Sequence, residues 1–314
     1  MDLFVTTFES VAVLLGIGLV GFWIIRRKLV PDTIFSLLSP LALEIALPCL
    51  IFVRIIQDFS IQELPEWWQL PLWWLFFTGI AAGLTGLFMF VSKKSSRREF
   101  SLTLFYQNGI FFPLAILSGM FPNEPSYVIS LILFTLFYPA FFFSTYFLFY
   151  RSSQKKVIHW KKIFHPVLLV TLLALAIRLT GLHTAVPTIV LDMSSLLGGM
   201  TIPLIMLILG GNMYVDFHKK GDIQLLEISK FVLAKNIVFP LIFIGILLLF
   251  KPIFSYTIAL LILLQSAVPP VTASPLVIER MGGNRILANQ FLFASFLLSL
   301  ISIPVIVTIF TFFF

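Results

Sequence analysis

Long apolar stretches separated by short polar segments run through nearly the whole chain of 314 residues. A helix needs roughly 20 apolar residues to cross about 30 Å of hydrocarbon. Stretches near that length lie around 9–25, 34–54, 70–91, 100–120, 126–150, 164–181, 187–212, 225–250, 254–278 and 286–312. The pattern predicts an all-α integral membrane protein with ten transmembrane helices.

Lys and Arg residues are concentrated in every second polar segment. These segments follow the first, third, fifth, seventh and ninth apolar stretches, and they hold sixteen of the 21 Lys and Arg residues. The segment after the second stretch instead holds Asp58, Glu63 and Glu66. Because Lys and Arg are enriched in cytoplasmic loops, the basic segments are predicted to be cytoplasmic and both termini extracytoplasmic.

The overall composition agrees with a chain whose solvent is the lipid bilayer. Hydrophobic residues make up 59% of the chain and charged residues 11%, whereas a soluble domain carries about 25% charged residues. The net charge of +7 lies in the short basic segments, so nucleic-acid binding is not expected. A multi-pass protein of the cell membrane is predicted.

The longest basic segment, 151–163, divides the chain into two parts of similar length. Residues 1–150 and 164–314 each hold five of the predicted helices, so two related halves must insert in opposite orientations. The second helix of each half carries a mid-helix proline, Pro48 in the first half and Pro203 in the second. These features predict an inverted five-plus-five repeat joined by a basic cytoplasmic linker.

The fourth predicted helix of each half is interrupted by proline beside polar residues, at 107–113 and at 265–270. Proline lacks an amide hydrogen and clashes with the carbonyl four residues earlier, so it frees backbone polar groups. At membrane depth such groups survive only where protein or an aqueous cavity covers them, and paired breaks are typical of a carrier's binding site. The candidate substrate site comprises Gln107, Asn108, Gly109, Pro113, Gln265, Ser266, Pro269 and Pro270.

The two breaks suit an anionic ligand. A half-helix that begins at a break points unpaired amides and the positive end of its dipole into the cavity, which favours a carboxylate. The side chains of Asn108 and Gln265 add further donors and acceptors. Two alternatives stay open: the prolines are ordinary kinks, or the amide side chains only bond neighbouring helices.

Charged residues also lie inside two predicted helices. Glu44 is near the middle of the second helix, and Lys235, followed by Asn236, lies deep in the eighth. Charges at this depth are unfavourable, so these three residues are candidates for ion coupling. Glu44 either carries a driving proton or faces a partner protomer or a structural cation. Lys235 either attracts the substrate, pairs with Glu44 or extends toward the cytoplasmic surface.

Short motifs in three predicted helices resemble the auxin efflux carrier family. They are 47–52 in the second helix, Asn108 and Gly109 with Pro113 in the fourth, and Pro269 with Pro270 in the ninth. The short central linker resembles that of the family's prokaryotic permeases, which are associated with malate, malonate or other organic anions. Plant carriers have asparagine at the position of Ser266, so the resemblance does not extend to auxin as the substrate.

The resemblance implies an architecture like that of bile-acid symporters. Helices 1, 2, 6 and 7 would form a scaffold, and helices 3–5 and 8–10 a moving transport domain. Helices 4 and 9 would cross near the membrane centre, and transport would proceed by an elevator-type mechanism. Related architectures suggest a homodimer through the scaffold.

The leading hypothesis is a secondary active transporter for a small organic anion, coupled to a proton or a sodium ion. An enzyme is not expected, because Glu44 and Lys235 are too scattered to form a catalytic set. No cofactor or metal is expected, since the sequence has no Gly-x-x-x-x-Gly-Lys motif and no His or Cys pair at metal-ligand spacing. The alternative is a membrane sensor or sterol-binding protein that binds a ligand on the same fold without transporting it.

Overall fold

The computed structural model describes residues 3–31, 34–150, 165–217 and 223–314, so the predicted linker 151–163 lies outside the described residues. The described residues are almost entirely helical, as predicted, and the one β-type contact among them is an isolated bridge. The α-helices are α1 (Leu3–Arg26), α2 (Ile34–Pro40), α3 (Leu47–Asp58), α4 (Leu70–Phe88), α5 (Arg97–Phe105), α6 (Phe111–Met120), α7 (Pro125–Phe134), α8 (Tyr138–Thr145), α10 (Pro166–Leu179), α11 (Thr188–Gly199), α12 (Thr201–Phe217), α13 (Leu225–Val232), α14 (Phe239–Leu249), α15 (Tyr256–Ala267), α16 (Ser274–Arg280) and α17 (Arg285–Phe313).

Seven helical stretches of the described chain are long and apolar enough to cross a membrane. They are Leu3–Arg26, Leu37–Asp58, Trp67–Val91, Pro125–Phe149, Thr188–Val215, Leu225–Leu249 and Arg285–Phe313. Three shorter apolar helices, α6, α10 and α15, fall within the three remaining predicted spans. Two of those spans are each split into two helices, α5 with α6 and α15 with α16. The count of ten membrane crossings and the inverted repeat stay predictions.

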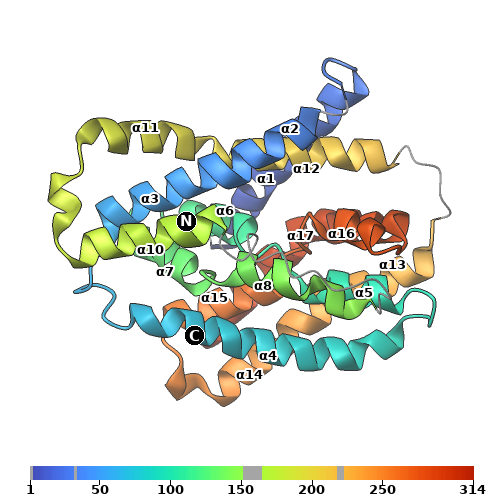
Figure 1. Ribbon diagram of the computed structural model, residues 1–314. Helices are drawn as coiled ribbons and strands as arrows, with labels where there is room; N and C mark the ends of the chain where they lie inside the picture. Colours follow the sequence, from blue (N-terminus) through green and yellow to red (C-terminus); the bar gives the residue numbers. More distant parts are fainter. Residues whose placement is uncertain (1–2, 32–33, 151–164, 218–222) are drawn as a thin grey trace.

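The helices are arranged in two groups with the broken segments between them. Helices α2, α11 and α12 lie along one side of the molecule, and α4 and α14 lie along the opposite side (Figure 1). On the first side, α1 packs along α12, and α3 packs against α10 and α11. On the other side, α14 contacts α15 and α17, and α17 in turn contacts α5, α13, α15 and α16. Helix α1 also touches α6 and α17, so the two groups are in contact.

The buried core is concentrated around the broken segments. Every residue of α15 from Ile258 to Ala267 is buried, as are the residues of α5 from Glu99 to Phe105. In α7, the residues from Val128 to Phe134 are buried too. Backbone that leaves the helical conformation next to these helices is therefore covered by protein, which is the condition for a break at membrane depth.

Small residues allow the closest helix contacts. A Cβ atom added to Gly210 of α12 would lie 1.7 Å from the Gly18 carbonyl oxygen of α1, and one added to Gly21 would lie 2.2 Å from the Leu207 carbonyl oxygen. A Cβ atom on Gly198 of α11 would lie 2.7 Å from the Cα atom of Leu50 in α3. Glycine is therefore required where the backbones of these helices approach each other.

Two π-helices each precede a proline. Segment η1 (Leu41–Ala46) runs into Pro48 of α3, and η6 (Leu233–Val238) runs into Pro240 of α14. Each proline ring clashes with the carbonyl four residues earlier, which belongs to Glu44 in η1 and to Asn236 in η6. A wider turn relieves this clash, and such π-helical turns are frequent at functional sites.

Candidate functional site

The two proline-containing breaks lie side by side and complete each other's backbone hydrogen bonds. Gln107 and Pro270 form an isolated antiparallel bridge. The Asn108 amide donates to the Pro269 carbonyl at 2.7 Å, and the Val271 amide donates to the Tyr106 carbonyl at 2.8 Å. Residues from the first half of the chain thus pair with residues from the second half at the centre of the buried core.

Gln265 adds side-chain hydrogen bonds across the same contact. Its Nε2 atom donates to the Gly109 carbonyl at 2.7 Å, and its Oε1 atom accepts from Nε2 of Gln107 at 3.1 Å. A Cβ atom on Gly109 would lie 2.3 Å from Oε1 of Gln265, so only glycine leaves room for this amide. Gln107, Gly109 and Gln265 therefore hold the two breaks together.

Asn108 differs from its two glutamine neighbours. The residue is 2% exposed, and its Nδ2 atom has no hydrogen-bond partner among the residues that the structure describes. It lies just before the first turn of α6, which begins at Phe111. A buried amide donor without a partner is rare in folded proteins and calls for an explanation, such as a ligand.

Pro113 occupies the first turn of α6, where its missing amide hydrogen has little effect. The first four amides of an α-helix have no acceptor within the helix, and Pro113 is the third residue of α6. Pro113 therefore starts a half-helix and does not kink a continuous one. Pro269 and Pro270 lie between α15 and α16, where they take part in the contact with residues 107–108.

Ser266 and Lys235 meet at the end of α15. The Ser266 hydroxyl donates to the Leu263 carbonyl within its own helix at 2.6 Å, so its side chain is engaged locally. The Ser266 carbonyl accepts a hydrogen bond from Nζ of Lys235 at 3.1 Å. Lys235 is only 1% exposed, which rules out an extension to the cytoplasmic surface. The eighth predicted helix thus contributes a buried ammonium group to the break.

The other two ion-coupling candidates lie elsewhere. Asn236 exchanges hydrogen bonds with Ser295 of α17, donating to its carbonyl at 3.0 Å and accepting from its hydroxyl at 2.7 Å. Glu44 is exposed on η1. A pair between Glu44 and Lys235 does not form, because the ammonium is buried against Ser266 while the carboxylate lies at the surface.

The comparison with protein families agrees with the membrane architecture. A family model described as a membrane transport protein matches residues 6–307, nearly the whole chain. The chain belongs to this family, the auxin efflux carrier family. A comparison with curated proteins gives no match. The protein is thus a multi-pass membrane transporter, and the family assignment is consistent with the expectation that it is not an enzyme.

Tyr138 lies at the candidate site of this transporter, and the sequence analysis missed it. Its hydroxyl donates to the Gln107 carbonyl, and its ring lines a small aromatic cavity together with Trp74, Tyr106 and Gln107. The available signal was Pro139, which follows Tyr138 where α7 gives way to α8. The fifth predicted helix is therefore also interrupted, beside the break in the fourth.

A second, apolar cavity lies beside the start of α6. Leu47, Leu50 and Ile51 of α3 face Ile110 and Leu114 across it. Residues of α7 and α10 complete the lining. In the transporter this cavity lies between the first turn of α6 and residues of α3 and α10.

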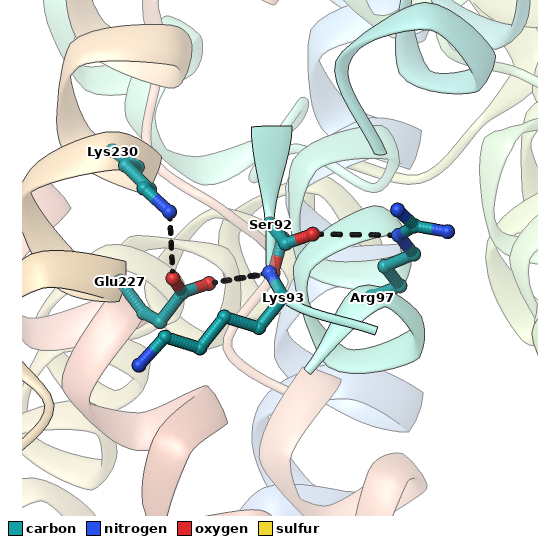
Figure 2. Close-up of polar contacts among 5 residues, drawn as sticks. All are labelled: Ser92, Lys93, Arg97, Glu227 and Lys230. Carbon is teal, nitrogen blue, oxygen red and sulfur yellow. Dashed lines mark hydrogen bonds and ion pairs between the residues drawn. The ribbon is translucent and has the colours of Figure 1, made fainter. Parts of the chain in front are cut away.

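Glu227 is a buried carboxylate near one end of the transporter. The sequence analysis missed this residue too. Figure 2 shows it between Lys230 and the backbone of Ser92 and Lys93. Its carboxylate accepts from the Ser92 hydroxyl at 2.7 Å, the Lys93 amide at 3.2 Å and Nζ of Lys230 at 2.9 Å. The Ser92 carbonyl in turn accepts from Nε of Arg97. This cluster fastens the segment after α4 to the first turn of α13, where a negative charge is favourable.

Proposed function

We propose that this transporter is a secondary active carrier of a small organic anion, which binds at the contact between the two breaks. The observation that carries the proposal is the buried Asn108 amide, which has no partner among the described residues and lies beside the first turn of α6. A carboxylate oxygen would accept from that amide and from the unpaired backbone amides of the α6 start.

The charges around the breaks support an anion over a cation. The start of α6 carries the positive end of a helix dipole, and Lys235 places an ammonium group at the neighbouring end of α15. No carboxylate of the described residues forms an ion pair with that ammonium. An anionic ligand would therefore enter a region where positive charge is not already neutralised by a side chain.

The finer mechanism is part of the same proposal. The broken helices would move as a transport domain against scaffold helices 1, 2, 6 and 7 in an elevator motion, driven by a proton or sodium gradient. The apolar cavity between α6 and α3 lies on the boundary between the proposed moving part and the proposed scaffold. A homodimer through the scaffold, within the cell membrane and with both termini outside, completes the proposed arrangement.

Uptake of radiolabelled organic acids into proteoliposomes, with and without a pH or sodium gradient, tests the proposal. We expect saturable uptake and counterflow by the wild type. Asn108→Ala should lower uptake about 10-fold or more, because a hydrogen bond to a charged group contributes roughly 1.5–3 kcal/mol. The melting temperature should change little, since the Asn108 amide loses no protein partner.

Asn212→Ala is the matched control, because Asn212 is an exposed asparagine of α12. It should transport as the wild type does. Equal uptake by the wild type and Asn108→Ala would refute the site. Ligand binding without counterflow would instead support a sensor or sterol-binding protein on the same fold.

A further inference from the structure

The side chain of Lys235 reaches the C-terminal end of α15. The helix ends at Ala267, and the last carbonyls of a helix carry the negative end of its dipole. Nζ of Lys235 donates to one of them, the Ser266 carbonyl, at 3.1 Å, and lies 5.4 Å from the centre of the Phe239 ring. Both the carbonyl and the ring face attract a positive charge.

At the corresponding end of α5, neutral groups bond two of the carbonyls. There the Gln107 carbonyl accepts from the hydroxyl of Tyr138, and the Tyr106 carbonyl accepts from the amide of Val271. All of these donors are neutral. The two breaks are therefore unequal: a charged side chain stabilises the helix end in the second half, and neutral groups do so in the first.

Lys235 is held in place by its own helix. It lies in η6, the π-helical turn before Pro240, and its neighbour Asn236 is fixed by two hydrogen bonds to Ser295 of α17. Those bonds tie this turn to α17 while Lys235 reaches α15. Among the described residues no carboxylate lies within ion-pair distance of Lys235. No side-chain carboxylate of the described residues therefore neutralises a charge on Lys235.

We propose that the ammonium group of Lys235 occupies the place at the end of α15 that a free sodium or potassium ion would otherwise take. We call this group the built-in cation. Its consequence for transport rests on the proposed carrier function and narrows the coupling ion to the proton: no sodium or potassium ion is needed for substrate binding. An ammonium has three donors, and the Ser266 carbonyl uses one of them. A bound monocarboxylate would leave the site neutral, which lowers the unfavourable cost of moving charge at membrane depth.

Thermal unfolding of the purified full-length protein tests the proposal without any substrate. Melting is compared in NaCl, KCl and choline chloride at equal ionic strength, and with added n-propylammonium chloride. The wild type should melt at the same temperature in all of them. Lys235→Ala should melt lower in choline chloride, and sodium or n-propylammonium should restore part of the loss by filling the site. Lys251→Ala, which removes an exposed lysine, should not respond.

A wild-type melting temperature that rises with sodium or potassium would overturn the proposal, because the site would then bind a free cation. A Lys235→Ala protein that is as stable as the wild type and insensitive to all cations would also overturn it. If Lys235→Ala can be purified only in the presence of sodium or n-propylammonium, the proposal is supported. If the variant cannot be purified under any condition, the wild type alone decides. Equal melting temperatures in all the salts support the proposal, and a rise with sodium or potassium overturns it.

Uptake of radiolabelled organic acids separates this inference from the proposed function. With choline in place of sodium and potassium on both sides, wild-type uptake should be unchanged. Uptake by Lys235→Ala should be at least ~10-fold lower than uptake by the wild type. Added n-propylammonium should restore part of it. Wild-type uptake that disappears in choline would refute the built-in cation but keep the carrier. If cations restore the melting temperature of Lys235→Ala but the wild type transports no organic acid, the carrier is refuted and the built-in cation is kept.

Discussion

At the scale of single residues, Gln265 is the side chain that fastens the two breaks to each other. Gln265→Ala would leave the Gly109 carbonyl and the Gln107 amide buried without their partner. Each unsatisfied buried group costs about 1–3 kcal/mol, so a clear fall in melting temperature is expected. The measurement is thermal unfolding in detergent. Gln57→Ala, at an exposed glutamine, should leave the melting temperature unchanged. A stable Gln265→Ala protein would mean that this amide does not hold the breaks.

Sequence reasoning located these residues but did not separate their roles. Proline spacing pointed to the two segments, and the structure places them side by side. The division between Gln265, which bonds protein groups, and Asn108, whose amide has no described partner, depends on contacts across the chain. Glu227 was missed because it lies near a predicted polar loop, where an acidic residue is ordinarily solvated. Their part in substrate binding stays a prediction.

At the scale of helices, the contact between α1 and α12 depends on the absence of side chains. Gly210→Ala would place a methyl group 1.7 Å from the Gly18 carbonyl oxygen, so the two helices must separate. Overpacking of this kind costs about 1–3 kcal/mol, which a lower melting temperature should show. Gly16→Ala is the control on the same pair of helices, because nothing lies within 4 Å of its added Cβ atom. An unchanged Gly210→Ala protein would show that the contact is not tight.

Hydrophobic periodicity predicted most helices and misplaced several of their ends. The first helix was expected to begin near residue 9 but begins at Leu3. The hydroxyls of Thr7 and Ser10 are accommodated in this earlier start, since they bond carbonyls one turn earlier at 2.8 Å. The π-helices η1 and η6 were not predicted. A proline can kink a helix or widen the turn before it, and only the surrounding packing selects between these outcomes.

At the scale of the whole molecule, loop charge and span lengths predicted a membrane protein but not how its halves meet. The hydrogen bond from Gln265 to Gly109 joins residues 156 positions apart. No periodicity along the chain reports such a contact. The broken fourth and ninth predicted spans also leave the number of crossings open, because α5 and α6 are each too short to span the bilayer alone.

Single-cysteine labelling decides whether the broken segment crosses the membrane. Cys49 is the only cysteine, so Cys49→Ser gives a background for Glu63→Cys, Ser95→Cys and Asn123→Cys, all at exposed positions. With an impermeant maleimide on intact cells, Glu63→Cys and Asn123→Cys should be labelled at once. Ser95→Cys should react only after permeabilisation, because the basic segment around it is predicted to be cytoplasmic. If Asn123→Cys also reacts only after permeabilisation, as Ser95→Cys does, then α5 and α6 enter and leave the membrane on one side. That result would refute the ten-helix topology and with it the inverted repeat.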